Sequence, residues 1–327
     1  MRYTLIINSR NNPSNQSRLE DAIYAVAEKN PALRSRMDLR YTEYAGHARD
    51  IALEVDSRFG GSAAVVACGG DGTMHEIASA LAFRKTPVIA VPFGTGNDFV
   101  KTVNPEWKKW SFEDYLTGLD DVHYRLIDLI RADSFDLLGN FIPVWSSFFN
   151  NVASIGLDTK VQANAKAMVA MKDTAFVRNT AYVRSALKAI FSERTNRFRY
   201  SLELEDGRVV EGESDKYTLM SICNAKYYGD GFTPAPEAVI DDGFADVCVV
   251  DDVSTLKALS LILKYRSGKH VGKDGIHMYK ATSGVIKSCD PSMQLPGNFD
   301  GEDFFGTTLR FEVCPGALKL GVFSPKN

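Results

Sequence analysis

The sequence contains little that would suit a membrane-spanning or secreted protein. Its first eight residues are too short an apolar run for a signal peptide, and no later run approaches the ~20 apolar residues of a membrane-spanning helix. A basic excess is also missing, because 38 Lys and Arg stand against 41 Asp and Glu, a formal net charge of -3. Proteins with a large nucleic-acid footprint need such an excess. We therefore expect a cytoplasmic protein that does not bind nucleic acid.

Cysteine and histidine patterns that build metal sites are absent too. The five cysteines stand far apart without a Cys-x-x-Cys pair, and the five histidines show no zinc-binding spacing. Neither a disulfide framework nor a zinc site is supported, and we expect buried, reduced thiols.

Two common nucleotide-binding signatures are also missing. No Gly-x-x-x-x-Gly-Lys-Ser/Thr occurs, because Lys101 lacks a preceding glycine and Lys269 lacks the rest of the pattern. The glycine-rich loop and catalytic-loop signatures of protein kinases are absent as well. A nucleotide would have to be held in another way.

The chain does have the length and patterning for two domains. At 327 residues it is about twice a typical domain, and its 45% hydrophobic and 24% charged residues are ordinary globular values. Short apolar runs alternate with helical spacing up to about residue 125, which predicts an open, mainly parallel α/β sheet. Strand-like runs then dominate. We expect an α/β domain over 1–129, with 311–327 as a candidate to complete it, and a β-rich domain over 130–310.

The strongest motif is a glycine turn between a predicted strand, 63–68, and a predicted helix, 74–81. It consists of Gly69, Gly70, Asp71, Gly72 and Thr73. Glycines let backbone N–H groups approach a ligand closely, and the N-terminus of the following helix favours bound phosphate. The turn is either a phosphate cradle or a tight structural turn with Asp71 as the helix N-cap.

A second glycine turn, which includes Gly94, Thr95, Asn97 and Asp98, follows the next predicted strand, 88–91. Carboxyl ends of parallel strands share one sheet edge, so both turns should lie where open α/β sheets bind ligands. Thr95 and Asn97 offer donors to phosphate or ribose, and Asp98 offers a carboxylate to a metal or its water shell. A purely structural turn is the alternative.

Two acidic turns lie in the second half of the chain. Residues 239–246 concentrate three carboxylates around a glycine, which suits either a hard cation such as Mg²⁺ or a hairpin turn. Asp300 and Glu302 flank a glycine and either take a proton from a hydroxyl or form a solvated turn.

The ordered set of these four motifs resembles the diacylglycerol kinase catalytic-domain family, particularly its soluble bacterial lipid kinases. The resemblance covers residues 3–323. The first motif alone is shared with NAD kinases and sphingosine kinases, whereas all four in this order are more specific. The resemblance implies an N-terminal α/β domain like those of phosphofructokinase and NAD kinase, a C-terminal β-sandwich, and ATP bound between them.

The resemblance also implies roles for individual residues. The positions matched to nucleotide binding are Thr42, Gly69, Gly70, Asp71, Gly72, Thr73, His75, Gly94, Thr95 and Asn97. A structural Mg²⁺ site is matched by Asp242 with the backbone carbonyls of Val239 and Phe244. The proton acceptor matches Glu302, with Asp300 as the alternative. Asp71 or Asp98 would act with Mg²⁺ on the γ-phosphoryl group.

Two features depart from the family pattern. Residues 8–13 read NSRNNP, where the family usually has Asn-Pro followed closely by glycine. His75 stands where bacterial members usually carry Asn, and the Met-His-Glu triplet is closer to sphingosine-type kinases.

The resemblance thus predicts ATP-dependent phosphorylation of a lipid hydroxyl, most simply of diacylglycerol to phosphatidic acid. An NAD kinase and a non-catalytic nucleotide- or lipid-binding regulator are the alternatives. A membrane lipid substrate requires peripheral membrane association, and a homodimer is left open. The basic residues in and beside segment 163–191 make it either a docking helix or an ordinary amphipathic core helix. They are Lys160, Lys166, Lys172 and Arg178.

Overall fold

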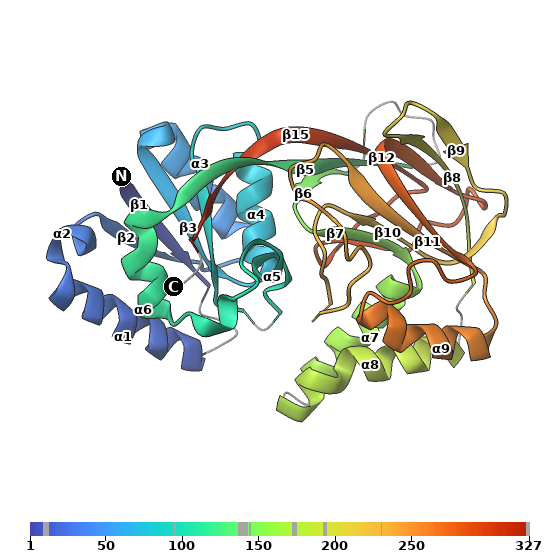
Figure 1. The fold of residues 1–327 in the computed structure, drawn as a ribbon, viewed down its shortest axis with the longest axis horizontal. Coiled ribbons are helices and arrows are strands. Elements are labelled where there is room, and N and C mark those ends of the chain that lie inside the picture. The colour runs from blue at the N-terminus through green and yellow to red at the C-terminus, as the bar shows by residue number, and fades with distance from the viewer. Residues whose placement is uncertain are drawn as a thin grey trace. The chain divides into compact units, whose positions relative to one another are not determined.

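The computed structural model describes residues 1–8, 13–94, 96–136, 143, 145–171, 175–191, 195–229 and 231–324. The chain divides into two compact units, Met1–Leu129 with Pro315–Asn327, and Ile130–Cys314 (Figure 1). It passes from the first unit to the second within strand β5 (His123–Phe135) and returns within β15 (Thr308–Val322). No helix in these described ranges is long and apolar enough to cross a membrane.

The first unit is a parallel sheet covered by helices, as the sequence predicted. Its strands run in the order β15-β4-β3-β1-β2. Besides β15, these strands are β1 (Arg2–Ile7), β2 (Met37–Tyr41), β3 (Ala63–Gly69) and β4 (Val88–Pro92). The helices are α1 (Pro13–Lys29), α2 (Pro31–Arg34), α3 (His47–Phe59), α4 (Asp71–Leu81), α5 (Asp98–Val103) and α6 (Phe112–Thr117). Short 3₁₀ turns span Gly60–Ser62, Trp107–Lys109 and Gly118–Asp121.

Burial of both sheet faces explains why the strands of this unit read as continuous apolar runs. Every residue of β3 is buried, because helices cover a parallel sheet on both sides. Alternate β3 residues, Ala64, Val66 and Cys68, pack into one core with side chains of α1 and α6. Helices α3 and α4 pack against each other and contact β3 as well.

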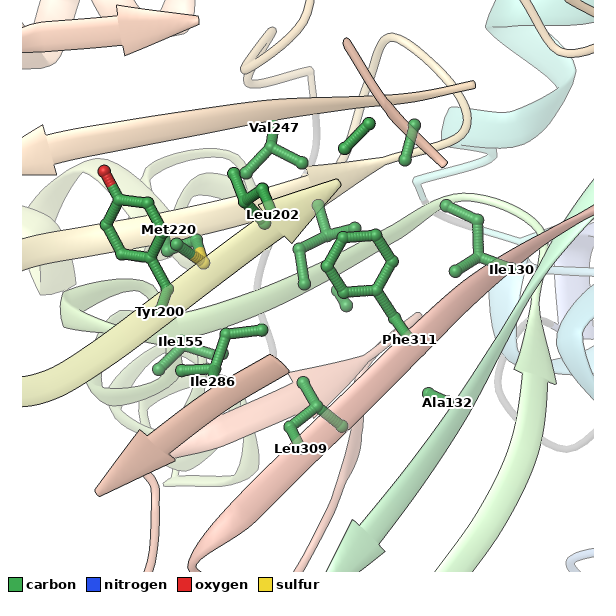
Figure 2. Close-up of a cluster of buried hydrophobic side chains, with 14 of the residues drawn as sticks. Ile130, Ala132, Ile155, Tyr200, Leu202, Met220, Val247, Ile286, Leu309 and Phe311 are labelled. Carbon is green, nitrogen blue, oxygen red and sulfur yellow. The ribbon is translucent and has the colours of Figure 1, made fainter. Parts of the chain in front are cut away.

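The second unit is built from antiparallel strands. Their order is β14-β13-β7-β10-β11-β12-β15, with β8 on β12, β9 on β8, and β5 between β15 and β6. The strands are β6 (Trp145–Phe149), β7 (Val152–Gly156), β8 (Asn196–Leu204), β9 (Val209–Glu211), β10 (Lys216–Cys223), β11 (Ala245–Asp251), β12 (Ile276–Ser288), β13 (Gly297–Phe299) and β14 (Glu302–Asp303). Figure 2 shows one core cluster of this unit, where Leu202, Val247 and Phe311 come together from β8, β11 and β15.

Among the described residues of the second unit, three segments are helical: α7 (Leu157–Met171), α8 (Ala175–Phe191) and α9 (Thr255–Arg266). Their inner faces form a second apolar core with β10 and β11. Within segment 163–191, which was expected to be helical, the described residues lie in α7 and α8.

Two sequence expectations are refined by the structure. The last apolar run, 317–323, returns to the first unit, because Leu320 and Gly321 of β15 pair with β4. The cysteines are reduced in the structure, but only Cys68, Cys223 and Cys248 are buried, while Cys289 and Cys314 are partly exposed.

Candidate functional site

The predicted nucleotide loops meet at one edge of the parallel sheet. Backbone hydrogen bonds continue the strand pairing beyond the ends of the strands. The Asn8 N–H donates to the Cys68 carbonyl at 3.0 Å, and the Thr42 N–H donates to the Ile7 carbonyl at 3.0 Å. The residues that follow β1, β2 and β3 are thereby held side by side.

The two glycine turns touch each other, which explains Gly94, while crowding within the first turn explains Gly69. A Cβ atom on Gly94 would lie 2.4 Å from the Gly70 Cα, and one on Gly69 would lie 2.3 Å from the Thr73 Cβ. Both distances are too short for any side chain. The Phe93 N–H also donates to the Gly69 carbonyl at 3.2 Å. The first turn leads directly into α4, so its backbone N–H groups lie at a helix N-terminus.

Asn97 maintains the shape of the second turn. Its φ of 54° is left-handed, and its side chain is 4% exposed. The amide oxygen accepts the Gly94 N–H at 2.9 Å, and the amide nitrogen donates to the Gly94 carbonyl at 2.7 Å. The side-chain amide of Asn97, which we expected to donate to phosphate or ribose, is therefore already hydrogen-bonded within the turn. Thr95 lies outside the described residues.

Two carboxylates converge on Gly96, which lies within the second turn. The Asp71 Oδ2 lies 3.0 Å and the Asp98 Oδ2 3.6 Å from the position of a Gly96 Cβ. Asp71 Oδ1 accepts the Phe99 N–H at 3.1 Å. Asp98 is buried and forms an ion pair of 2.7 Å with Lys101. Oxygen atoms from adjacent loops are suitable ligands for Mg²⁺ or its water shell.

Two further residues of this edge were not singled out from the sequence. Asn8 donates to the Thr73 hydroxyl at 3.2 Å, while its Oδ1 is buried without a hydrogen-bond partner in the described chain. Such an acceptor marks a place for a ligand or water donor. Glu76 accepts the N–H groups of Gly46 and Ala48 at 2.9 and 3.1 Å. It thus supplies the side-chain cap that Gly46 cannot give to α3. In the sequence, the only indication that this helix needs a cap from elsewhere is the glycine at its start.

His75 and Thr42, two predicted nucleotide-binding residues, differ in their exposure to solvent. His75 lies on α4 and is 7% exposed, so little of its ring is open to a ligand. Thr42 is half-buried at the sheet edge, directly after β2.

In the second unit, the acidic turn already contains a positive charge. The Asp242 Oδ1 accepts the Phe244 N–H at 3.1 Å, and its Oδ2 contacts the Lys280 ammonium. Neighbouring Asp246 is 7% exposed, and burial raises the pKa of its carboxyl to about 6, partly offset by Lys280. The turn as arranged fits an ammonium group, and Mg²⁺ would have to displace Lys280 from Asp242. The described residues contain no cluster of three or more acidic, His or Cys side chains suited to a metal.

Asp300 and Glu302 have different surroundings. Asp300 has a left-handed φ of 48°. Its carboxylate accepts three backbone N–H groups, from Asn150 at 3.1 Å, Asn151 at 3.2 Å and Val152 at 2.9 Å. Glu302 begins β14 and is exposed. Asp300 therefore anchors the turn to the start of β7, which leaves Glu302 as the carboxylate open to a substrate.

The anchored segment carries buried polar atoms of its own. Asn150 and Asn151 are only 1% and 3% exposed. Their side-chain oxygens are nevertheless without a hydrogen-bond partner in the described chain. Buried acceptors without partners are rare in proteins. Here two of them lie beside the turn that presents Glu302.

Comparisons with known proteins agree with the resemblance seen in the sequence. Residues 2–132 match the diacylglycerol kinase catalytic domain, and residues 151–322 match the YegS C-terminal NAD kinase beta sandwich-like domain. A Pseudomonas savastanoi pv. phaseolicola protein named "Probable lipid kinase YegS-like" is 30% identical over 92% of this chain and 88% of its own length.

Solved structures share the fold. A diacylglycerol kinase from Bacillus anthracis str. Sterne has a TM-score of 0.64 over 99% of this chain and 97% of its own, at 20% identity. Yeast NADH kinase, crystallised with NADH, has a TM-score of 0.51 over 100% of this chain and 84% of its own, at 10% identity. These two likenesses concern the fold alone. With both domain matches and a 30% identical relative along nearly its whole length, the chain belongs to the YegS-like lipid kinases of the diacylglycerol kinase catalytic-domain family.

Proposed function

We propose that this protein transfers the γ-phosphoryl group of ATP to a lipid hydroxyl, with diacylglycerol as acceptor and phosphatidic acid as product. The observation that carries the proposal is the contact between the two glycine turns, within a chain of this family. Gly69 and Gly94 have no room for a side chain, so backbone N–H groups can come close to phosphate oxygens.

On the donor side, the first turn and the N-terminus of α4 would hold the phosphates of ATP. An eleven-residue helix places a partial positive charge at this end. Asp71 would hold Mg²⁺ or its water shell beside Gly96, and Asp98 would join it where Mg²⁺ displaces Lys101. The ion would neutralise charge on the phosphoryl group. The Asn8 Oδ1 would accept a hydrogen bond from a water or a ribose hydroxyl.

On the acceptor side, Glu302 would remove the proton of the lipid hydroxyl as the oxygen forms a bond to phosphorus and ADP leaves. Asp300 would position this turn through its three backbone hydrogen bonds. The buried oxygens of Asn150 and Asn151 are suited to accept hydrogen bonds from the polar part of the lipid. The two asparagines would thus bind the polar part of the lipid, while Glu302 acts on its hydroxyl.

The second unit also offers apolar surface for a lipid. A cavity of about 60 Å³ lies among α7, α8, α9 and the sheet, lined by side chains that include Leu157, Ile190 and Phe232. On the outside of the same helices, Met171, Phe191 and Leu256 are 87%, 69% and 81% exposed. Exposed apolar side chains of this kind support docking of a cytoplasmic protein on a membrane surface. Of the basic residues in and beside segment 163–191, Lys160 in α7 is half-buried, whereas the side chains of Lys166, Lys172 and Arg178 lie outside the described residues.

The test is a transfer assay with purified protein and ATP labelled in the γ-phosphate. Diacylglycerol in vesicles, NAD and a no-acceptor control are supplied in parallel, each with Mg²⁺. Label in phosphatidic acid is the expected result. Label in NAD would identify an NAD kinase instead, and nucleotide binding without transfer to any acceptor would indicate a regulator.

A further inference from the structure

The first unit has an arginine-lined pocket at the sheet edge opposite the glycine turns. The pocket has a volume of about 320 Å³, and its charged lining residues are Arg2, Arg36, Asp38, Arg40, Glu54 and Arg58. Arg2 begins β1, whereas Asn8 follows the end of that strand. At about 3.3 Å per strand residue, the two ends of β1 are roughly 17 Å apart. The pocket is therefore separate from the candidate nucleotide site.

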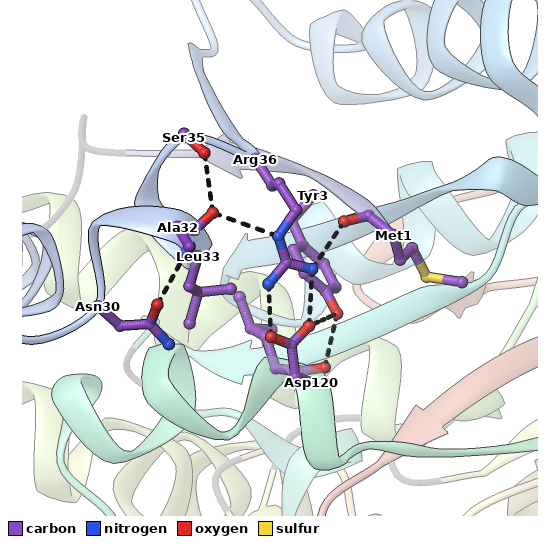
Figure 3. A network of polar contacts seen from close by, with 9 residues as sticks. Met1, Tyr3, Asn30, Ala32, Leu33, Ser35, Arg36 and Asp120 are labelled. Atoms are coloured by element: carbon purple, nitrogen blue, oxygen red, sulfur yellow. Dashed lines mark hydrogen bonds and ion pairs between the residues drawn. The ribbon is translucent and has the colours of Figure 1, made fainter.

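Two of its four arginines are neutralised by carboxylates. Arg36 forms a two-pronged pair with Asp120, which also accepts the Tyr3 hydroxyl at 2.8 Å (Figure 3). The bonds from Arg36 hold the pKa of Asp120 below its ordinary value. Arg40 pairs with Glu54 at 2.9 Å. These pairs fix the walls of the pocket and contribute little net charge.

Arg2 and Arg58 are different, because neither forms an ion pair within the described chain. Their guanidinium carbons lie 4.7 and 5.1 Å from the centroid of the Phe59 ring. Since both contact one ring, the two carbons are at most about 10 Å apart. Stacking on an aromatic ring restrains a guanidinium group and leaves its in-plane N–H donors able to bind another partner.

We propose that Arg2 and Arg58 form a binding site for a phosphate group, carried by a small phosphorylated molecule or by a phospholipid headgroup. Each guanidinium can give a phosphate two parallel hydrogen bonds, and both groups line the same pocket, with their carbons no more than about 10 Å apart. Asp38, the remaining lining carboxylate, offsets one of the two charges. A single phosphate therefore suits the pocket better than a polyphosphate.

The test compares the full-length wild type with Arg2→Gln, Arg58→Gln and the control Lys85→Gln. Lys85 is an exposed cation of the same unit outside the pocket lining, so the control has the same change in charge. In one arm, inorganic phosphate is titrated while Tm is recorded. In the other, the proteins are sedimented with phosphatidylcholine vesicles, with and without phosphatidate. Phosphate binding at the glycine turns is common to all four proteins and cancels in the comparison.

We expect Arg2→Gln and Arg58→Gln to weaken binding about tenfold or more in at least one arm, while Lys85→Gln behaves like wild type. Loss in the phosphate arm identifies a soluble ligand, and loss only with phosphatidate vesicles identifies a headgroup. Equal behaviour of all four proteins in both arms would overturn the proposal. If circular dichroism shows that Arg2→Gln is unfolded, the comparison of Arg58→Gln and Arg58→Lys with wild type tests the phosphate site instead. Arg58 is exposed in the last turn of α3, so we expect both of its variants to fold.

Discussion

The separate roles inferred for Asp300 and Glu302 give the sharpest prediction. Asp300→Asn replaces one carboxylate oxygen with an NH₂ group, which cannot accept a backbone N–H. At least one of the three bonds to Asn150, Asn151 and Val152 is then lost, and the others lose their charge assistance. A hydrogen bond to a charged group contributes about 1.5–3 kcal/mol, and a donor left without its partner costs a similar amount. We expect a loss of about 2–4 kcal/mol in the free energy of unfolding of the second unit.

For a unit of this size, each kcal/mol lowers Tm by roughly 2–4 °C. Asp300→Asn should therefore melt roughly 4–16 °C below wild type. Glu302→Gln should melt like wild type, because Glu302 is exposed. Its effect should fall on kcat, which we expect to drop by ~10²–10⁴, with KM for ATP nearly unaltered.

The measurements are calorimetric melting of both variants and initial rates at saturating ATP. A thermally intact Asp300→Asn protein with a large loss in kcat, beside a nearly normal Glu302→Gln, would reverse the two assignments. Near-normal kcat in both would remove this turn from the mechanism and move the search for the base to Asp71 and Asp98.

Three other predictions follow from the described contacts. Gly94→Ala should reduce ATP affinity much more than Gly70→Ala in a binding titration. The Cβ added at Gly94 would lie 2.4 Å from the Gly70 Cα, whereas the Cβ added at Gly70 would lie 3.4 Å from the Gly94 Cα. Equal affinities would refute a role for the contact between the two glycine turns. Mg²⁺ should raise the Tm of Lys280→Met more than that of wild type, since the variant exposes Asp242 to a cation; equal shifts would place any Mg²⁺ elsewhere. Burial lowers the pKa of His270 in the folded protein below its ordinary value of 6.5. The contribution of this histidine to the free energy of unfolding is therefore present above pH 6.5 and is lost as the pH falls toward the folded-state pKa. His270→Gln should flatten the dependence of Tm on pH in that range, and an unchanged dependence would contradict this.

The sequence predicted the family from the order of its four motifs. It predicted the parallel sheet because the strands of the first unit are short apolar runs that each end in glycine or polar residues. Its glycine turns were identified as neighbours for the same reason, since residues after adjacent parallel strands share an edge. The structure adds why Gly69 and Gly94 must be glycine, which depends on atoms of Thr73 and Gly70.

The sequence could not predict roles that depend on residues far apart along the chain. Asp300 is fixed by backbone groups about 150 positions away, and no side-chain pattern records that a main-chain N–H lies nearby. Lys280 neutralises Asp242 across 38 positions. The same is true of Arg2 and Arg58, whose shared position on Phe59 follows from the start of β1 meeting the end of α3.

Strand β15 also affects the order in which the protein can be made and folded. Its last residues pair with β4 in the first unit, although the ribosome produces them after the whole second unit. At about 5–20 residues per second, the roughly 230 residues after β4 take on the order of 10–50 s to synthesise. During this time the edge of β4 lacks its final partner, and an unpaired strand edge is a template for aggregation. The parallel sheet of the first unit is therefore completed only after the second unit has been synthesised, and until then the edge of β4 is the place where the nascent chain is exposed to aggregation.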